Sequence, residues 1–262
     1  MSDNRVSRIE KLCAMLQELT DNQLDFVERV AKQFTQPYIL AERIPSSDIV
    51  TDCLLTTFGD ALRIHHCFSK EPLSKDRFEY ALERSSYLCR LNVELAPKGN
   101  PGHDITISGV PISLKTEASA GIRTDRVHIS KFMELGKGEW DLPLLRERYL
   151  NHMQSYDRIF TLRCLSKRIE RWHYQLVEIP KALLLKAQEG LLRIDTKSRQ
   201  NPQPGYCDVI DANGSIQFQL YFDAGTERKL QVRNLDITYC IVHATWIFST
   251  QSPLDIQSSL KP

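Results

Sequence analysis

Residues able to support phosphodiester chemistry gather near the middle of this 262-residue chain. Asp104 opens one β-rich run, and Lys115 and Glu117 lie in the run that follows it. Because side chains alternate faces along a strand, Ser113, Lys115 and Glu117 point to one side and Leu114 to the other. A hairpin made of the two runs is expected to bring Asp104 beside Lys115 and Glu117 on one polar face.

Two carboxylates and a lysine in this arrangement suit metal-assisted hydrolysis of a phosphodiester. Carboxylate oxygens together with retained waters are ligands that Mg²⁺ prefers. The cation stabilises charge on the scissile phosphate and lowers the pKa of a bound water, while a lysine orients that water or neutralises the pentacovalent phosphate. We therefore expect Asp104 to hold magnesium with a glutamate and the Leu114 carbonyl, and Lys115 to assist the water.

The hairpin that positions these groups has clear sequence signals. Residues 97–102 (PKGNPG) interrupt regular structure, and the runs 104–107 and 112–116 then flank the turn 108–111 (SGVP). Gly109 can adopt a positive φ, and the proline of the turn suits the first residue of a strand. The pattern predicts two antiparallel strands.

Helical and strand patterns surround the hairpin and predict one α/β (α+β) domain, a mixed β-sheet core flanked by helices. Residues 1–36 read as helical, with Thr20 or Asp21 capping a second helix that Pro37 ends. Further helices are expected at 74–91, 140–153 and 181–187, and strands at 158–163, 172–179, 216–222, 229–232 and 240–248, while residues 127–130 are expected to form a strand or a loop. An apolar stretch through Phe58 is expected to break at Gly59-Asp60. In the single domain 1–262, residues 1–95 are largely helical and residues 100–250 carry the hairpin and the mixed sheet.

The composition of the chain bears on its cellular location, its cysteines and its charge distribution. No apolar run of about 18 residues exists and the N-terminus has no secretory pattern, so we expect no membrane partner and a cytoplasmic location. Seven cysteines lie singly, which predicts reduced thiols used as small core residues and no protein-built zinc site. Lysine plus arginine (34) nearly balances aspartate plus glutamate (33). Since total charge does not report on a cleft, the balance predicts basic residues on one side and acids elsewhere.

The hairpin resembles the motif of the PD-(D/E)xK nucleases, in which an acid opens one strand and acid-x-lysine follows in the next. Here the motif is Pro101-Gly102-His103-Asp104 and Ser113-Leu114-Lys115, so a serine stands where the second acid is expected. The family often takes its second carboxylate from elsewhere. Candidates are Glu117 on the same strand face, or Glu79 or Glu83 on the preceding helix.

Over most of its length the chain resembles the SmaI-type restriction endonucleases. The similar segments run in order from about residue 50 to residue 246 and are FGDALRIHHCFS, NPGHDITI, LKTEA, HISKFMELGKGEW, RIFTLR, YQLVEIPKALLL, PQPGY and LYFDAGTERKLQ. The resemblance implies a restriction-endonuclease-like fold and a Mg²⁺-dependent type II enzyme of a restriction-modification system. Such an enzyme cuts double-stranded DNA at CCCGGG to leave blunt ends with 5′-phosphates; a staggered cut of the same hexamer stays open.

A G/C hexamer must be read in the major groove, where guanine presents two acceptors to arginine or lysine. Candidates for this contact are Arg228, Lys229 and Arg233 in GTERKLQVR, whereas Lys131, Lys137 and Arg123 suit phosphate contacts. His65 and His66 are expected to be structural. The palindrome calls for a homodimer, with the helical surfaces of the N-terminal third as a candidate interface.

Two alternatives remain at this stage. One keeps the fold but makes the protein a repair or structure-specific nicking nuclease. The other is a non-catalytic DNA-binding protein on the same scaffold, which only Ser113 supports.

Overall fold

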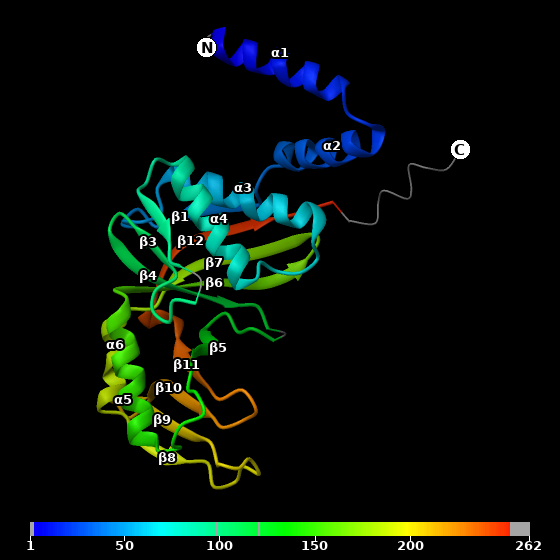
Figure 1. The fold of residues 1–262 in the computed structure, drawn as a ribbon. Helices are drawn as coiled ribbons and strands as arrows, with labels where there is room; N and C mark the ends of the chain where they lie inside the picture. Colours follow the sequence, from blue (N-terminus) through cyan, green and yellow to red (C-terminus); the bar gives the residue numbers. More distant parts are fainter. Residues whose placement is uncertain (1–2, 98, 120, 252–262) are drawn as a thin grey trace.

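The computed structural model describes residues 3–97, 99–119 and 121–251, and its strands form two sheets with helices packed against them (Figure 1). Lys98, in the predicted break before the hairpin, lies outside the described residues. The expected mixed α+β architecture is confirmed.

The larger sheet contains the predicted hairpin. Its strand order is β1(Leu40–Arg43), β12(Ile241–Phe248), β7(Arg171–Glu178), β6(Arg158–Arg168), β4(Val110–Glu117), β3(Ile105–Ile107) and β2(Val93–Leu95). β4 and β6 run parallel, and the other pairs are antiparallel. Helices α3(Asp52–Phe68) and α4(Lys75–Leu88) cover one face, where Ile112 and Leu114 enter a core with Phe58, Phe78 and Trp246. The alternation along β4 therefore leaves Ser113 and Lys115 on the opposite face.

The second sheet is antiparallel and forms the lower half of the molecule in Figure 1. Its order is β5(Arg126–Glu134), β11(Lys229–Asp236), β10(Ile216–Asp223), β9(Gly205–Ile210) and β8(Leu191–Ile194). Helices α5(Leu142–His152) and α6(Lys181–Leu185), followed by a short 3₁₀ turn at Lys186–Gln188, pack against one face. A second core forms there from residues such as Phe132, Tyr149, Phe218 and Leu230.

The β3–β4 turn has the geometry that the sequence predicts, although it is shorter. Ile107 pairs with Val110, so only Ser108 and Gly109 form the loop. Their φ values are +51° and +82°, the left-handed pair typical of a two-residue hairpin turn. β4 consequently starts at Val110, two residues before the predicted start.

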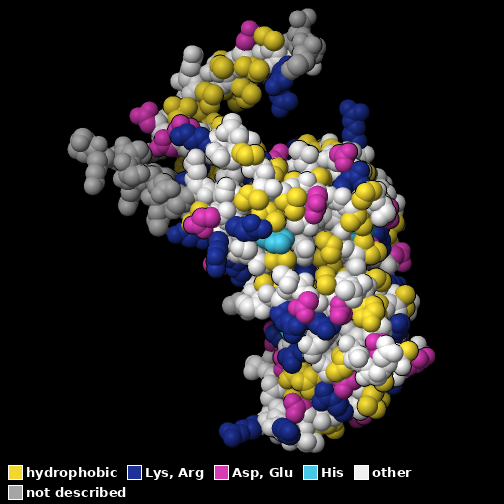
Figure 2. All heavy atoms as spheres, turned by 180° about the vertical axis from the view of Figure 1, so that it is seen from behind, with side chains coloured by type: hydrophobic (Ala, Val, Ile, Leu, Met, Phe, Trp, Pro, Cys, Tyr) yellow, Lys and Arg dark blue, Asp and Glu magenta, His cyan; other side chains and the backbone are white. Residues whose placement is uncertain are grey.

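The predicted N-terminal helices are present as α1(Asp3–Gln17) and α2(Asp21–Thr35). Thr20 caps α2 in a capping box with Gln23, as one of the two expected caps. α2 packs on the body through Arg29 and Gln33, while the apolar stripe that includes Leu24, Val27 and Phe34 stays 37–44% exposed. α1 projects from the body, and Figure 2 shows hydrophobic side chains gathered along it. Among the described residues, no helix is long and apolar enough to cross a membrane.

The structure corrects the expected break at Gly59-Asp60, because α3 continues through both residues. A Cβ at Gly59 would lie 2.8 Å from the Trp246 ring and 2.6 Å from the Tyr38 hydroxyl. This glycine thus allows close packing of α3 on β12 and does not interrupt the helix. Strands β1, β2 and β8 were not predicted because each has only three or four residues, and the six-residue strand β9 was also missed.

The prediction that all cysteines are reduced core residues is wrong for one pair. Cys53 and Cys89 form a disulfide that joins α3 to the end of α4. The helices bring these residues together over 36 positions of sequence, a proximity that linear spacing does not reveal. Cys67, Cys164 and Cys207 are free and buried, as expected, whereas Cys13 is free but exposed, so it is not a core residue.

Candidate active site

Asp104 is held immediately before β3 by the strand that pairs with it. Its Oδ2 accepts hydrogen bonds from the Leu114 backbone N–H at 2.6 Å and from the Ser113 hydroxyl at 3.2 Å. Ser113, which stands at the position of the missing acid, therefore orients the acid that is present. The Asp104 side chain is 12% exposed, and its other oxygen, Oδ1, forms an ion pair with a lysine.

Lys75 is the group that Oδ1 meets, and sequence reasoning missed it. It lies in the first turn of α4, which Ser74 caps. Its ammonium is 2.6 Å from Asp104 Oδ1 and 3.1 Å from Glu79 Oε1. One cation therefore bridges two carboxylates that come from different elements. The i,i+4 spacing between Lys75 and Glu79 was visible in the sequence. The sequence did not indicate that this turn of the helix lies beside Asp104.

The structure also distinguishes between Glu79 and Glu83, the two candidate metal ligands on α4. Glu79 lines a cavity of about 530 Å³ together with Asp104, and burial raises the pKa of its carboxyl group. Glu83, one turn later, lines neither this cavity nor the neighbouring one. The structure thus brings Glu79, and not Glu83, to Asp104.

Lys115 lies on the polar face of β4, as predicted, and is only 8% exposed. Its ammonium lies 5.4 Å from the centre of the Phe132 ring. Burial lowers the pKa of Lys115 to about 8, against the opposing charge of Asp104. An ammonium with this pKa stays mainly protonated at neutral pH but releases its proton far more readily than an exposed lysine.

A second cavity, of about 650 Å³, is lined by Lys75, Lys115 and Asp104. His152, at the end of α5, also lines this cavity. Burial lowers the pKa of His152 to about 4, so its ring is neutral at pH 7. Its Nε2 has no hydrogen-bond partner among the described residues. Sequence reasoning did not identify His152, because it is distant in sequence and belongs to no motif.

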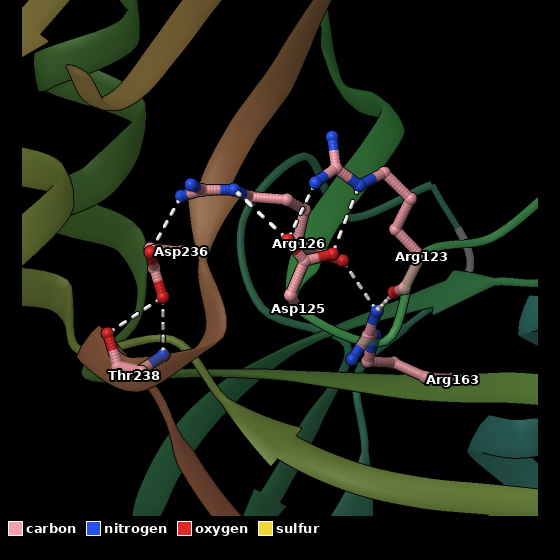
Figure 3. Close-up of polar contacts among 6 residues, drawn as sticks. All are labelled: Arg123, Asp125, Arg126, Arg163, Asp236 and Thr238. Carbon is pink, nitrogen blue, oxygen red and sulfur yellow. Dashed lines mark hydrogen bonds and ion pairs between the residues drawn. The ribbon is translucent and has the colours of Figure 1, made fainter.

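Glu117 is not at this site, and the expectation that the hairpin places it beside Asp104 is wrong. In the parallel register of β4 and β6, Glu117 lies opposite Arg163. Its carboxylate accepts from Arg163 Nε at 2.6 Å and from the His128 backbone N–H at 3.0 Å, so both oxygens are engaged. Arg163 in turn donates to the backbone carbonyls of Arg123 and Arg126 (Figure 3). Glu117 thus neutralises a buried arginine that organises a loop.

The donor set at Asp104 and Glu79 fits a magnesium ion. The described residues contain no group of three or more histidine, cysteine, aspartate and glutamate side chains that could hold a metal. Magnesium, however, is commonly bound by one or two carboxylates, with waters and substrate phosphate completing its coordination. The Lys75 ammonium between the two carboxylates shows that this position accommodates a cation.

Two of the three cations expected to contact DNA phosphates, Lys131 and Arg123, are paired with nearby acids. Lys131 contacts Glu134 at 2.9 Å and also pairs with Glu227, while Arg123 contacts Asp125 at 2.6 Å (Figure 3). The expectation that acids lie away from the basic residues is therefore wrong for this surface. Figure 2 likewise shows basic and acidic side chains interspersed over the lower half of the molecule.

The cations expected to read bases lie in two places. Arg228 lines a cavity of about 440 Å³, where it donates to the Gly138 carbonyl at 2.8 Å and lies over Trp140; Lys137, one of the expected phosphate contacts, lines the same cavity. Lys229 and Arg233 instead lie on β11, in the second sheet. His66 stacks on Trp172 with ring centres 3.5 Å apart, and His65 bonds the Glu71 carbonyl, which agrees with structural roles.

The chain is similar in sequence to known type II restriction enzymes. Residues 12–248 match a family model described as "SmaI: Type II site-specific deoxyribonuclease". The type II restriction enzyme SmaI of Serratia marcescens is 44% identical over 249 residues, which cover 95% of this chain and all of that protein. A solved restriction endonuclease in complex with substrate DNA covers 78% of this chain and 88% of its own, with a TM-score of 0.33 and 11% identity.

Replacing Glu117 by glutamine is expected to destabilise the fold. The substitution keeps the shape of the side chain but leaves the fully buried Arg163 without its counter-charge, at a cost of about 3–5 kcal/mol. Urea unfolding measures the change. Glu134→Gln, in an exposed ion pair, is the matched control and should change stability by less than about 1 kcal/mol. If the Glu117→Gln protein kept its stability but bound magnesium more weakly, Glu117 would be a metal ligand after all.

Proposed function

Because the chain belongs to the SmaI family of type II site-specific deoxyribonucleases, we propose that it hydrolyses double-stranded DNA at the hexamer CCCGGG with magnesium as its cofactor. One observation supports the proposed site above all others. Asp104, Glu79 and Lys115 border two cavities that share Asp104 and Lys75 in their linings, and the Lys75 ammonium bridges the two carboxylates. The hairpin motif alone does not produce this arrangement.

Each residue of the proposed site has a distinct role. Asp104 and Glu79 hold magnesium, with the Leu114 carbonyl as a further ligand. When bound, the ion neutralises charge on the scissile phosphate and lowers the pKa of a bound water. Lys115 donates a hydrogen bond to the attacking water or to a phosphate oxygen, and its low pKa allows proton exchange near neutral pH. In-line hydrolysis then leaves a 5′-phosphate.

DNA binding is proposed to use two sets of cations. Lys131 lines the larger cavity beside Asp104 and contacts the DNA phosphates together with Lys137 and Arg123. Arg228, Lys229 and Arg233 are proposed to contact guanine edges. The protein acts in the cytoplasm, where its DNA substrate would be found.

The palindromic site also calls for two copies of the chain, so we propose a homodimer with one active site per DNA strand. The exposed apolar side chains of α1 and α2 support an interface there. In α1 these include Val6, Ile9, Leu12 and Met15, which are 49–64% exposed. A blunt cut follows if the two active sites face phosphates directly across the duplex, whereas another spacing of the sites gives staggered ends.

Alanine at Asp104, Lys115 or Glu79 should slow cleavage by at least about 100-fold, because each substitution removes a metal ligand or the group that assists the water. A plasmid with a single CCCGGG site, incubated with magnesium or EDTA, measures linearisation. Glu83→Ala is the matched control and should cleave normally. Normal cleavage by both Asp104→Ala and Lys115→Ala would refute the site, and product that stops at nicked circles would favour the nicking nuclease.

Lys75→Met should bind magnesium about ten-fold more tightly than the wild-type protein. The Lys75 ammonium competes with the metal for Asp104 and Glu79, and two partly exposed ion pairs give competition of roughly this size. Isothermal titration calorimetry on the DNA-free protein measures the affinity. Lys32→Met, which removes the exposed i,i+4 pair with Glu28, serves as the control. Weaker binding by Lys75→Met would show that the lysine supports the metal and does not compete with it.

Glutamate at Ile9 and Leu12 should dissociate the proposed dimer, since charges would replace exposed apolar side chains at the interface. Light scattering after gel filtration should then shift from twice the chain mass to 30.2 kDa. Ser7→Glu, on the polar side of α1, should leave the dimer intact. A wild-type protein that elutes as a monomer, alone and on its DNA site, would contradict the proposal.

A further inference from the structure

We propose that the polar outer face of the five-stranded sheet is the surface that reads the DNA bases, and that Arg233 is its guanine contact. The proposal rests on the proposed function and deepens it. The face is opposite the side on which α5 and α6 pack (Figure 1).

Alternation along the strands forms this face. Leu230 and Val232 of β11 enter the core, so Gln231 and Arg233 point outward. The strand register then aligns two rows of polar and aromatic residues. One row is Arg233, Gln219 and Asp208, and the other is Gln231, Tyr221, Tyr206 and Arg193.

The two arginines of the face lie over tyrosine rings. The Arg233 guanidinium carbon is 3.6 Å from the centre of the Tyr221 ring, and that of Arg193 is 4.0 Å from the centre of the Tyr206 ring. The tyrosines contact each other, with ring centres 4.9 Å apart. Tyr221 is itself only 9% exposed, so it forms a rigid support beneath Arg233.

Hydrogen bonds fix the direction of Arg233. Its Nε donates to Gln231 Oε1 at 2.9 Å, and Gln231 is held in turn by Asp223 at 3.0 Å. Within the described part of the chain, the terminal nitrogens of Arg233 make no hydrogen bond or ion pair. A guanidinium anchored through Nε with both terminal nitrogens free presents the fork that binds guanine O6 and N7.

The other residue types on the face suit a site built from G·C pairs. Cytosine presents an amino donor in the major groove, which aspartate accepts. Asp208 lies in the same row as Arg233 and is oriented by Gln219 and Arg193, each at 2.6 Å. Arginine and aspartate in one row of the sheet face, with Gln219 between them, thus offer groups complementary to guanine and to cytosine.

Strand β5 links this sheet to the catalytic cavity. Lys131 to Glu134 of β5 line that cavity, and Ile129 of the same strand pairs with Val232 beside Arg233. Because β5 is shared, base reading and phosphate positioning occur on one connected scaffold.

The decisive experiment combines a protein variant with a base analogue. Binding of Arg233→Met to a CCCGGG duplex, without metal, should fall roughly 10- to 100-fold, with little loss on a scrambled duplex. Replacing the guanines by 7-deazaguanine removes the N7 acceptor. The analogue should weaken binding of the Arg233→Met protein by a clearly smaller factor than binding of the wild-type protein, because the contact from Arg233 to N7 is already lost in the variant. Arg233→Lys, which keeps the charge but loses the fork, should also lose discrimination.

Arg84→Met is the matched control, because Arg84 is an arginine that likewise lies over a tyrosine ring, on the exposed surface of α4. It should behave as wild type. Equal weakening of Arg233→Met on both duplexes, with a smaller salt dependence, would identify a phosphate contact and overturn the proposal. Additive effects of the variant and the analogue, or unchanged discrimination by a folded Arg233→Met protein, would also overturn it while leaving the proposed function intact. A wild-type protein that does not prefer CCCGGG would instead refute the proposed target site.

Discussion

The arrangement of the catalytic groups depends on the hydrogen bond from the Leu114 backbone N–H to the Asp104 carboxylate. This bond, at 2.6 Å, joins the residue that opens β3 to the strand that carries Lys115. A carboxylate that receives a backbone donor cannot rotate freely, so its second oxygen has a defined direction. Lys75 in the first turn of α4 contacts that oxygen, and the two residues of this contact line both cavities.

How much of this could be predicted follows from the range of each interaction. The hairpin, Asp104 and Lys115 were accessible because a two-residue turn and strand alternation are local properties. Glu79 was one of several candidates, since its helix could be predicted but its rotation and distance from the hairpin could not. Glu117 was misplaced because its partner, Arg163, comes from a parallel strand 46 residues away, and no local pattern encodes that register.

The near-equal numbers of basic and acidic residues are reflected in ion pairs on the surface. The exposed cations around the proposed DNA surface are matched by neighbouring carboxylates such as Asp125, Glu134 and Glu227. A phosphate backbone must compete with these internal partners, which reduces the electrostatic affinity for arbitrary DNA. Discrimination between sequences can then depend more on directed hydrogen bonds, such as those available to Arg233, than on net attraction.

The projecting first helix has a consequence for how the protein folds. α1 is 15 residues long, and nearly all its side chains are exposed. An isolated helix of that length is at the margin of stability in water, because nucleation is costly and few contacts repay it. If a second chain provides the missing packing, formation of α1 becomes a concentration-dependent event. The N-terminal segment would then complete its folding during assembly, after the two sheets and their cores have formed.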